Sequence, residues 1–204
     1  LLVAMIGGII LAGKKMDKFH SNPDLKEKVL NTIADQIAHF DRIGLDIGYS
    51  YEQGAIIPDG TELLAPNDKV TEYIPSTRPG ARFPHLNFQK KTAPTSSHDL
   101  LDYRFFTLFI REKGRDWETA LTQLSPAIQQ KTKVVRLDEL GLSETVYTAL
   151  ICLCEIEVTG ALLIRPDGHV AWRIKTFEGD AVEKLQQVFQ QFFQNKTNMN
   201  YENH

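Results

Sequence analysis

The segment that most constrains the fold of this chain is GALLIRPDGHVAWR, residues 160–173. It begins with a short apolar run, continues with the turn residues Pro-Asp-Gly-His, and resumes with β-branched and aromatic residues. Proline fixes φ at the second turn position, and Gly168 accepts a positive φ. The segment therefore predicts a β-hairpin. Arg165 and Arg173 on either side of Asp167 predict a charge cluster at the hairpin end, whose expected role is structural.

The elements around the hairpin predict an α/β domain. Residues 104–110 have strand propensity, Asp116 can cap a helix with apolar residues at helical spacing, and residues 133–137 favour a second strand. Residues 138–156 are ambiguous between helix and strand, and Asp180 can cap a last amphipathic helix. The order is βαβ followed by ββα, which predicts a thioredoxin-like arrangement.

The chain before this domain is predicted to consist of a helical segment followed by a turn-rich connector. Ser21 or Asn22 can cap a helix that Gly44 is expected to end. Its predicted apolar stripe consists of Leu25, Val29, Ile33, Ile37 and Phe40. Frequent Gly and Pro then predict a connector with two or three short strands that packs over a neighbouring surface. The expected regions are a helical segment at 1–44, a turn-rich connector at 45–99, the thioredoxin-like domain at 100–196 and a polar tail at 197–204.

Composition matters mainly for the partners and sites that it excludes. The 23 basic and 26 acidic residues give a net charge of −3 without a broad basic stripe, so nucleic acid is not an expected partner. Cys152 and Cys154 stand one residue apart in an apolar run and offer neither a disulfide framework nor a zinc quartet. We expect two buried free thiols, which favour a reducing compartment and a cytoplasmic location.

The chain opens on the apolar run LLVAMIGGIILAGKK. The run is shorter than the ~20 residues of a membrane span, and it lacks the charged leader and cleavage site of a signal peptide. A membrane is therefore not an expected partner. We interpret the chain as a fragment that begins within a longer protein.

The motifs that carry chemistry are incomplete. Redox chemistry on a thioredoxin-like scaffold needs C-x-x-C after the first strand, where residues 111–116 contain no cysteine. The sequence also contains no G-x-G-x-x-G between a strand and a helix, no P-loop, no H-E-x-x-H and no G-x-S-x-G. We therefore predict no catalytic, cofactor-binding or metal-binding residue in this chain.

Polar residues gather in STRPGARFPH, residues 76–85, and in SSHD, residues 96–99. Two arginines and a histidine could grip a phosphate or carboxylate. The favoured interpretation is that Pro and Gly fix a bent connector whose arginines pair with carboxylates across a domain seam. The candidate domain-interface residues are Arg78, Arg82, His85, Asp99, Arg165, Asp167 and Arg173.

Four blocks of the chain together resemble a known family. The blocks are DQIAHF leading to GLDIGYSY, then PSTRPGARFPH, then SSHDLLDYRFFTLF, then GALLIRPDGHVAWR. In this order they resemble the carboxy-terminal part of FAD-dependent aromatic-ring hydroxylases, the phenol hydroxylase-like flavin monooxygenases. The resemblance covers most of residues 35–175.

The resemblance implies an amino-terminal part that binds FAD and encloses the substrate, and a carboxy-terminal thioredoxin-like domain without redox cysteines. In such enzymes NAD(P)H reduces FAD, and oxygen from O₂ is transferred to a phenolic ring. The expected function is the carboxy-terminal segment of such a monooxygenase, inactive alone, which packs on the missing FAD part or mediates subunit contact. A homodimer is a further candidate, through aromatic surface at Phe189, Phe192 and Phe193.

Two alternatives stay open. One is a divergent thiol protein that uses Cys152 and Cys154. The other is a free-standing thioredoxin-like interaction module, which residues 1–12 would tether to a membrane.

Overall fold

The computed structural model describes residues 23–24, 27, 30–31, 41–88 and 96–194. The predicted amino-terminal apolar stripe, the run at 1–12 and the polar tail lie outside the described residues. The chain divides into two compact units. The first comprises residues up to Ile47 together with Pro66–Tyr73, and the second comprises Gly48–Ala65 and all residues from Ile74 onward.

The first unit holds a short helix, α3 (Ile43–Ile47). Gly44 lies inside α3, so its predicted place at a helix end is wrong. Its backbone N–H donates to the Val70 carbonyl at 3.0 Å. A Cβ at this position would lie 2.5 Å from the carbonyl oxygens of Lys69 and Glu72. Glycine is needed because two chain segments approach closely, and not because the helix stops.

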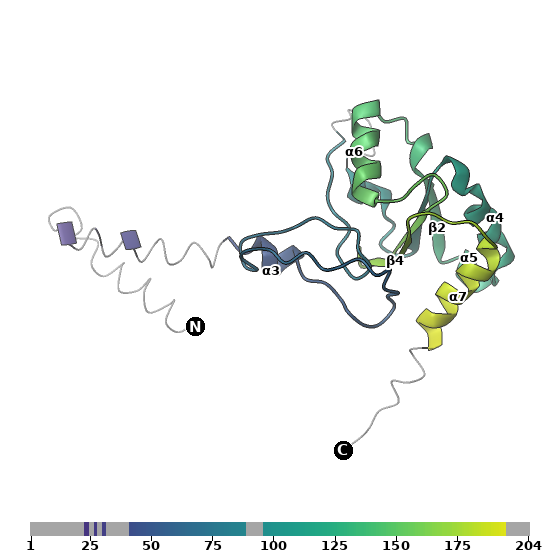
Figure 1. Ribbon diagram of the computed structural model, residues 1–204, viewed down its shortest axis with the longest axis horizontal. Coiled ribbons are helices and arrows are strands. Elements are labelled where there is room, and N and C mark those ends of the chain that lie inside the picture. The colour runs from purple at the N-terminus through teal and green to yellow at the C-terminus, as the bar shows by residue number, and fades with distance from the viewer. Residues whose placement is uncertain (1–22, 25–26, 28–29, 32–40, 89–95, 195–204) are drawn as a thin grey trace, which may run out of the picture. The chain divides into compact units, whose positions relative to one another are not determined.

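The second unit is a mixed α/β domain built on a four-stranded sheet (Figure 1). The strands are β1 (Phe106–Ile110), β2 (Thr132–Arg136), β3 (Ala161–Ile164) and β4 (Val170–Ile174). Their order in the sheet is β2-β1-β3-β4, with β1 and β2 parallel and the other two pairs antiparallel. The central strands β1 and β3 are almost continuous apolar runs because helices or connector chain cover both faces.

Helices connect and cover the strands in the predicted βαβ and ββα order. They are α4 (Arg115–Gln123), α5 (Pro126–Gln129), α6 (Glu144–Cys154) and α7 (Ala181–Gln194), with 3₁₀ turns η2 (Ser97–Leu100), η3 (Glu112–Gly114) and η4 (Leu137–Glu139). The ambiguous region 138–156 is thus mainly helical. Within the described ranges, no helix combines the length and the apolar character that crossing a membrane requires.

The core lies in two layers, one on each face of the sheet. Alternate residues of β1 supply both layers: Leu108 and Ile110 pack with α4 and α7, whereas Phe109 packs with Leu150 of α6. Phe189 and Phe192 of α7 are only 2% and 5% exposed. Our expectation that they form exposed aromatic surface is therefore wrong, because their rings pack against Phe106 in the core. The side chain of Phe193 lies outside the described residues.

Two aspartates were predicted as helix caps, and one prediction holds. Asp180 Oδ1 accepts hydrogen bonds from the backbone N–H groups of Val182 and Glu183 at 2.8 and 3.2 Å. Asp116 instead lies in the first turn of α4, where Gly114 occupies the N-cap position. The chain enters α4 directly from the 3₁₀ turn η3, so the helix begins earlier than the aspartate indicated.

The predicted hairpin is confirmed. Strands β3 and β4 pair in antiparallel register, and the Gly168 N–H donates to the Arg165 carbonyl at 3.0 Å to close the turn. Gly168 has φ of 80°, and the Arg165 N–H donates to the His169 carbonyl at 2.8 Å. This is a turn with proline at its second position followed by a glycine bulge.

The connector packs on this same domain, along the outer side of β4. The Ile57 N–H donates to the Ala171 carbonyl at 2.8 Å, and the Gly80 N–H donates to the Val170 carbonyl at 2.8 Å. In the described part of the connector, the two or three strands expected here are reduced to isolated bridges, such as Arg82 with His169. Proline and glycine in the connector prevent a continuous ladder, but the backbone groups of β4 still find partners.

Candidate functional site

The centre of the polar network is Arg173, whose side chain is 0% exposed. A buried guanidinium needs carboxylate and hydrogen-bond partners. Asp59 Oδ2 lies 2.7 Å from Arg173 Nε, and the hydroxyl oxygens of Thr61 and Thr77 lie 2.6 and 3.0 Å from its terminal nitrogens. Glu155 Oε2 lies 3.2 Å from Nη1. Arg173 thereby ties β4 to two connector segments and to the end of α6.

The carboxylate that faces Arg173 is held in its ionised form. Burial raises the pKa of Asp59, but hydrogen bonds from Thr61 and Arg173 and the charge of Arg173 outweigh it and leave the pKa below its usual value. The Thr77 hydroxyl also donates to the Leu153 carbonyl at 2.9 Å. The group is therefore fully engaged in structural contacts.

Arg78 forms a second tie within the connector. Its Nε donates to the Thr61 carbonyl at 2.9 Å, and its terminal nitrogens donate to the Ser50 hydroxyl at 3.1 Å and to Glu52 at 3.1 and 3.3 Å. The Arg78 side chain is 15% exposed. It is thus committed to its own unit, and its guanidinium is not free to bind an external anion.

Arg165 and Asp167 form an ion pair at the hairpin end, as the sequence predicts. Arg173, which was expected in the same cluster, pairs with Asp59 instead, so that part of the prediction is wrong. Asp167 also accepts from the His169 backbone N–H at 3.2 Å. Burial raises the pKa of Asp167, but hydrogen bonds to His169 and the charge of Arg165 lower it to about 2. The buried His169 ring packs against the rings of Tyr49 and Tyr51, at centroid distances of 5.1 and 4.7 Å.

The remaining predicted interface residues lie elsewhere. Arg82 bridges to His169 through the backbone, close to the hairpin end. The His85 ring lies 5.4 Å from the ring of His98. Asp99 Oδ2 accepts from the Ser96 N–H at 2.9 Å and closes a capping box at the start of η2. The seven residues therefore do not converge on one site.

The junction between β1 and α4 is where a redox motif or a dinucleotide fingerprint would lie. It contains no cysteine, and its one glycine is Gly114. A Cβ on Gly114 would lie 3.3 Å from Ile110 Cβ and 3.3 Å from Trp117 Cδ1. The glycine packs against the core and offers no open backbone cradle for a pyrophosphate. This junction therefore does not fit the pyrophosphate of FAD.

The two cysteines lie at the end of α6. Burial raises the pKa of the Cys154 thiol well above its usual value, with Arg111 and Arg173 opposing the rise. Cys152 is exposed, so the expectation of two buried thiols is wrong for this residue. In a helix, residues two apart point to different sides, whereas in a strand they would share one face. Among the described residues no three metal-ligating side chains gather.

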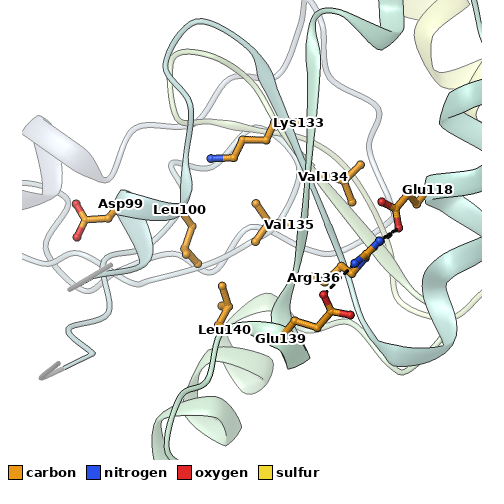
Figure 2. A pocket seen from close by; sticks show the side chains of 9 residues that line it. All are labelled: Asp99, Leu100, Glu118, Lys133, Val134, Val135, Arg136, Glu139 and Leu140. Atoms are coloured by element: carbon orange, nitrogen blue, oxygen red, sulfur yellow. Dashed lines mark hydrogen bonds and ion pairs between the residues drawn. The ribbon is translucent and has the colours of Figure 1, made fainter. Parts of the chain in front are cut away.

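A cavity of about 630 Å³ lies along β2, one of the two edge strands of the sheet (Figure 2). Figure 2 shows Arg136 between two carboxylates. Arg136 donates to Glu118 at 2.6 Å and to Glu139 at 2.9 Å, and its hydrogen bond lowers the pKa of Glu139. Glu139 therefore stays ionised beside the arginine and is not suited to donate a proton near neutral pH. Arg136 and its two carboxylates pair with one another and therefore serve the structure.

Comparison with known proteins identifies the family. The family model described as "Aromatic-ring hydroxylase, C-terminal" matches residues 76–195, which is more than half of the chain. The chain belongs to this family. It is homologous to the carboxy-terminal region of FAD-dependent aromatic-ring hydroxylases, the phenol hydroxylase-like monooxygenases.

Named relatives agree with this assignment. The chain is 29% identical to a phenol 2-monooxygenase of a Pseudomonas species over 142 residues, which cover 69% of this chain and 23% of that protein. It is 30% identical to a 2,4-dichlorophenol 6-monooxygenase of Cupriavidus pinatubonensis over 163 residues, which cover 79% of this chain and 27% of that protein. The chain spans about a quarter of the length of the curated relatives it matches.

A solved structure of the flavin-dependent monooxygenase PieE, in complex with FAD and substrate, superposes with a TM-score of 0.67 and 28% identity. The match covers 89% of this chain and 32% of that one. The structure of aklavinone-11 hydroxylase with FAD and aklavinone gives a TM-score of 0.55 at 28% identity, covering 72% of this chain and 26% of that one. The fold of this aromatic-ring hydroxylase segment therefore recurs in flavoenzymes.

Sequence reasoning found the arginines of the network but missed most of their partners. Asp59, Thr61 and Glu155 were not singled out because they lie far from Arg173 along the chain or carry no motif of their own. The available signal was an arginine inside an apolar strand, since a buried guanidinium requires a carboxylate.

Proposed function

We propose that this chain is the carboxy-terminal segment of a FAD-dependent, NAD(P)H-using aromatic hydroxylase, and that its role there is structural. In the complete enzyme FAD would supply the oxygenation chemistry, on a part of the protein outside this chain. The residues described above would hold a domain that packs against that part. A second copy of the chain is a further candidate partner.

A thioredoxin-like domain is the form that we propose for the second unit. The order βαβ followed by ββα, around a sheet with one parallel and two antiparallel pairs, supports it. The junction after β1, without a cysteine, supports a domain that keeps the fold but not the thiol chemistry.

The observation that carries the structural role is the full engagement of Arg173. The buried guanidinium of Arg173 is fully occupied by contacts with Asp59, Thr61, Thr77 and Glu155. Catalysis needs a group that is free to exchange protons or contact a substrate, and this network offers none. It joins connector, sheet and helix into one body.

The test uses the purified 204-residue chain and free FAD. After incubation and gel filtration we expect a colourless protein without a flavin spectrum and without NAD(P)H oxidation in the presence of phenol. Far-ultraviolet circular dichroism must show that the chain is folded. Stoichiometric flavin retained by the folded chain would overturn the proposal.

The packing role has its own test in the complete protein. Arg173→Met in the full-length enzyme is expected to lower thermal stability while the turnover per bound flavin stays unchanged. A large loss of turnover per flavin without a loss of stability would show that this network takes part in the reaction.

A further inference from the structure

A second, more enclosed cavity of about 320 Å³ lies where β1 begins. Its volume falls at the low end of the range of small-molecule sites. It is formed within the second unit from five separate parts of the chain: the connector, the start of β1, the stretch from α5 to the start of β2, the hairpin turn and α7. The apolar residues that line it are Ala55, Phe106, Ile128, Pro166, Phe189 and Phe192.

Aromatic rings form one wall of this cavity. Phe106 lies parallel to Phe192 at a centroid distance of 6.1 Å, and its ring meets that of Phe189 edge to face at 5.8 Å. Phe189 and Phe192 are also core residues, so packing fixes their orientation. A wall held in this way can receive an apolar body without rearrangement of the core.

The charged residues that line the cavity are both cations, Arg104 and Lys131. Arg104 donates to both carboxylate oxygens of Asp102, each at 3.1 Å, and stands over the Phe105 ring at 5.2 Å. These contacts hold its guanidinium in place. The Lys131 ammonium forms no ion pair with any residue in the described part of the chain.

The contrast with the larger cavity identifies the kind of ligand. There Arg136 is neutralised by Glu118 and Glu139. Here no carboxylate lines the cavity among the described residues, and Lys131, which has no ion-pair partner among them, lines it together with the phenylalanines. An anion beside an apolar wall interacts more strongly with a nearby cation than it would in bulk water.

We propose that this cavity binds a small apolar carboxylate, with Lys131 contacting the carboxylate and the phenylalanine wall holding the apolar body. The site does not depend on FAD or on the proposed role in a hydroxylase, because every lining residue belongs to this unit. Aromatic and aliphatic carboxylates share this chemistry.

The experiment titrates the 204-residue chain with 2-naphthoate, with octanoate and with the neutral 2-naphthalenemethanol, followed by amide chemical shifts and calorimetry. We expect saturable binding of at least one carboxylate, shifts at Ile128 and Thr132, and weaker binding of the alcohol. The carboxylate that binds with the higher affinity shows whether the apolar part of the ligand is aromatic or aliphatic. The absence of saturable carboxylate binding at millimolar concentration would overturn the proposal.

Variants locate the site. Lys131→Gln is expected to weaken carboxylate binding about threefold, as for a partly screened ion pair, and to leave alcohol binding unchanged. Lys133→Gln is the matched control, because it removes an equal charge two residues away at the other cavity. Equal affinities of the two variants would overturn the role of Lys131.

A third variant blocks the mouth of the cavity without touching a charge. Ala127 is an exposed lining residue in α5, so Ala127→Trp is expected to leave the fold intact and to abolish binding of both carboxylates. Unchanged binding in a folded Ala127→Trp chain would show that the ligand lies elsewhere.

Discussion

At the scale of single residues, Arg173 decides how the connector is held. A buried arginine whose partners are all in place leaves uncompensated polar groups when it is removed. We expect Arg173→Met to lower the free energy of unfolding by about 3 kcal/mol, measured by urea denaturation. Arg165→Met is the control, because the Arg165 and Asp167 side chains are 20% and 40% exposed. It is expected to change stability by less than about 1 kcal/mol, and equal losses would contradict the argument.

Acid stability is a second property set by single residues. The pKa values of Asp59 and Asp167 are lowered in the folded chain, that of Asp167 to about 2. The unfolded chain binds protons at higher pH, so this stability is fully present above the usual pKa of 3.8 and is lost as pH falls through the folded values. Urea denaturation between about pH 5 and pH 2 is therefore expected to show a decline that is smaller in Asp167→Asn. An identical decline in that variant would exclude Asp167 as a contributor, and Asp138→Asn serves as the exposed control.

At the scale of elements, the hairpin depends on two glycines for different reasons. Gly168 has φ of 80°, and a Cβ there would meet nothing closer than 3.9 Å. Gly160 precedes β3, and a Cβ there would lie 2.2 Å from the Lys175 carbonyl oxygen. Backbone conformation requires the first glycine, and close approach of the neighbouring strand requires the second.

The two alanine variants should therefore rank in a fixed order. Gly168→Ala is expected to destabilise by about 1 kcal/mol, the usual penalty of a left-handed conformation. Gly160→Ala is expected to destabilise more, because backbone atoms of β4 and the residue after it would have to move. Thermal unfolding of both variants checks the order, and a more stable Gly160→Ala chain would contradict it.

At the scale of the whole molecule, the connector belongs to the domain on which it packs. Residues 48–65 and 74–88 supply Asp59, Thr61 and Thr77 to Arg173 and backbone partners to β4. A fragment of residues 100–204 lacks all of these groups. We expect it to unfold without a sharp transition, whereas residues 48–204 unfold cooperatively in urea. Cooperative unfolding of the shorter fragment with equal stability would show that the connector is dispensable.

The elements that sequence patterns predicted are those that depend on nearby residues. The turn at Pro166 and Gly168, the Asp180 cap and the strand expected within residues 104–110 are confirmed. Predictions failed where neighbours distant in the chain decide. Gly44 serves a close approach to Lys69 and Glu72, and Asp116 gives way to a 3₁₀ turn that starts α4 early.

By itself the sequence determined the hairpin, the order of strands and helices after residue 100 apart from α6, the absence of a redox or dinucleotide motif, and the family resemblance. These follow from residue type and short spacing. The tertiary structure alone decided which carboxylate faces Arg173, since Asp59 lies 114 residues away. It also decided that Phe189 and Phe192 are core, and that a cation-lined cavity lies beside them. Burial and charge pairing arise from the packing of distant segments, which no local pattern specifies.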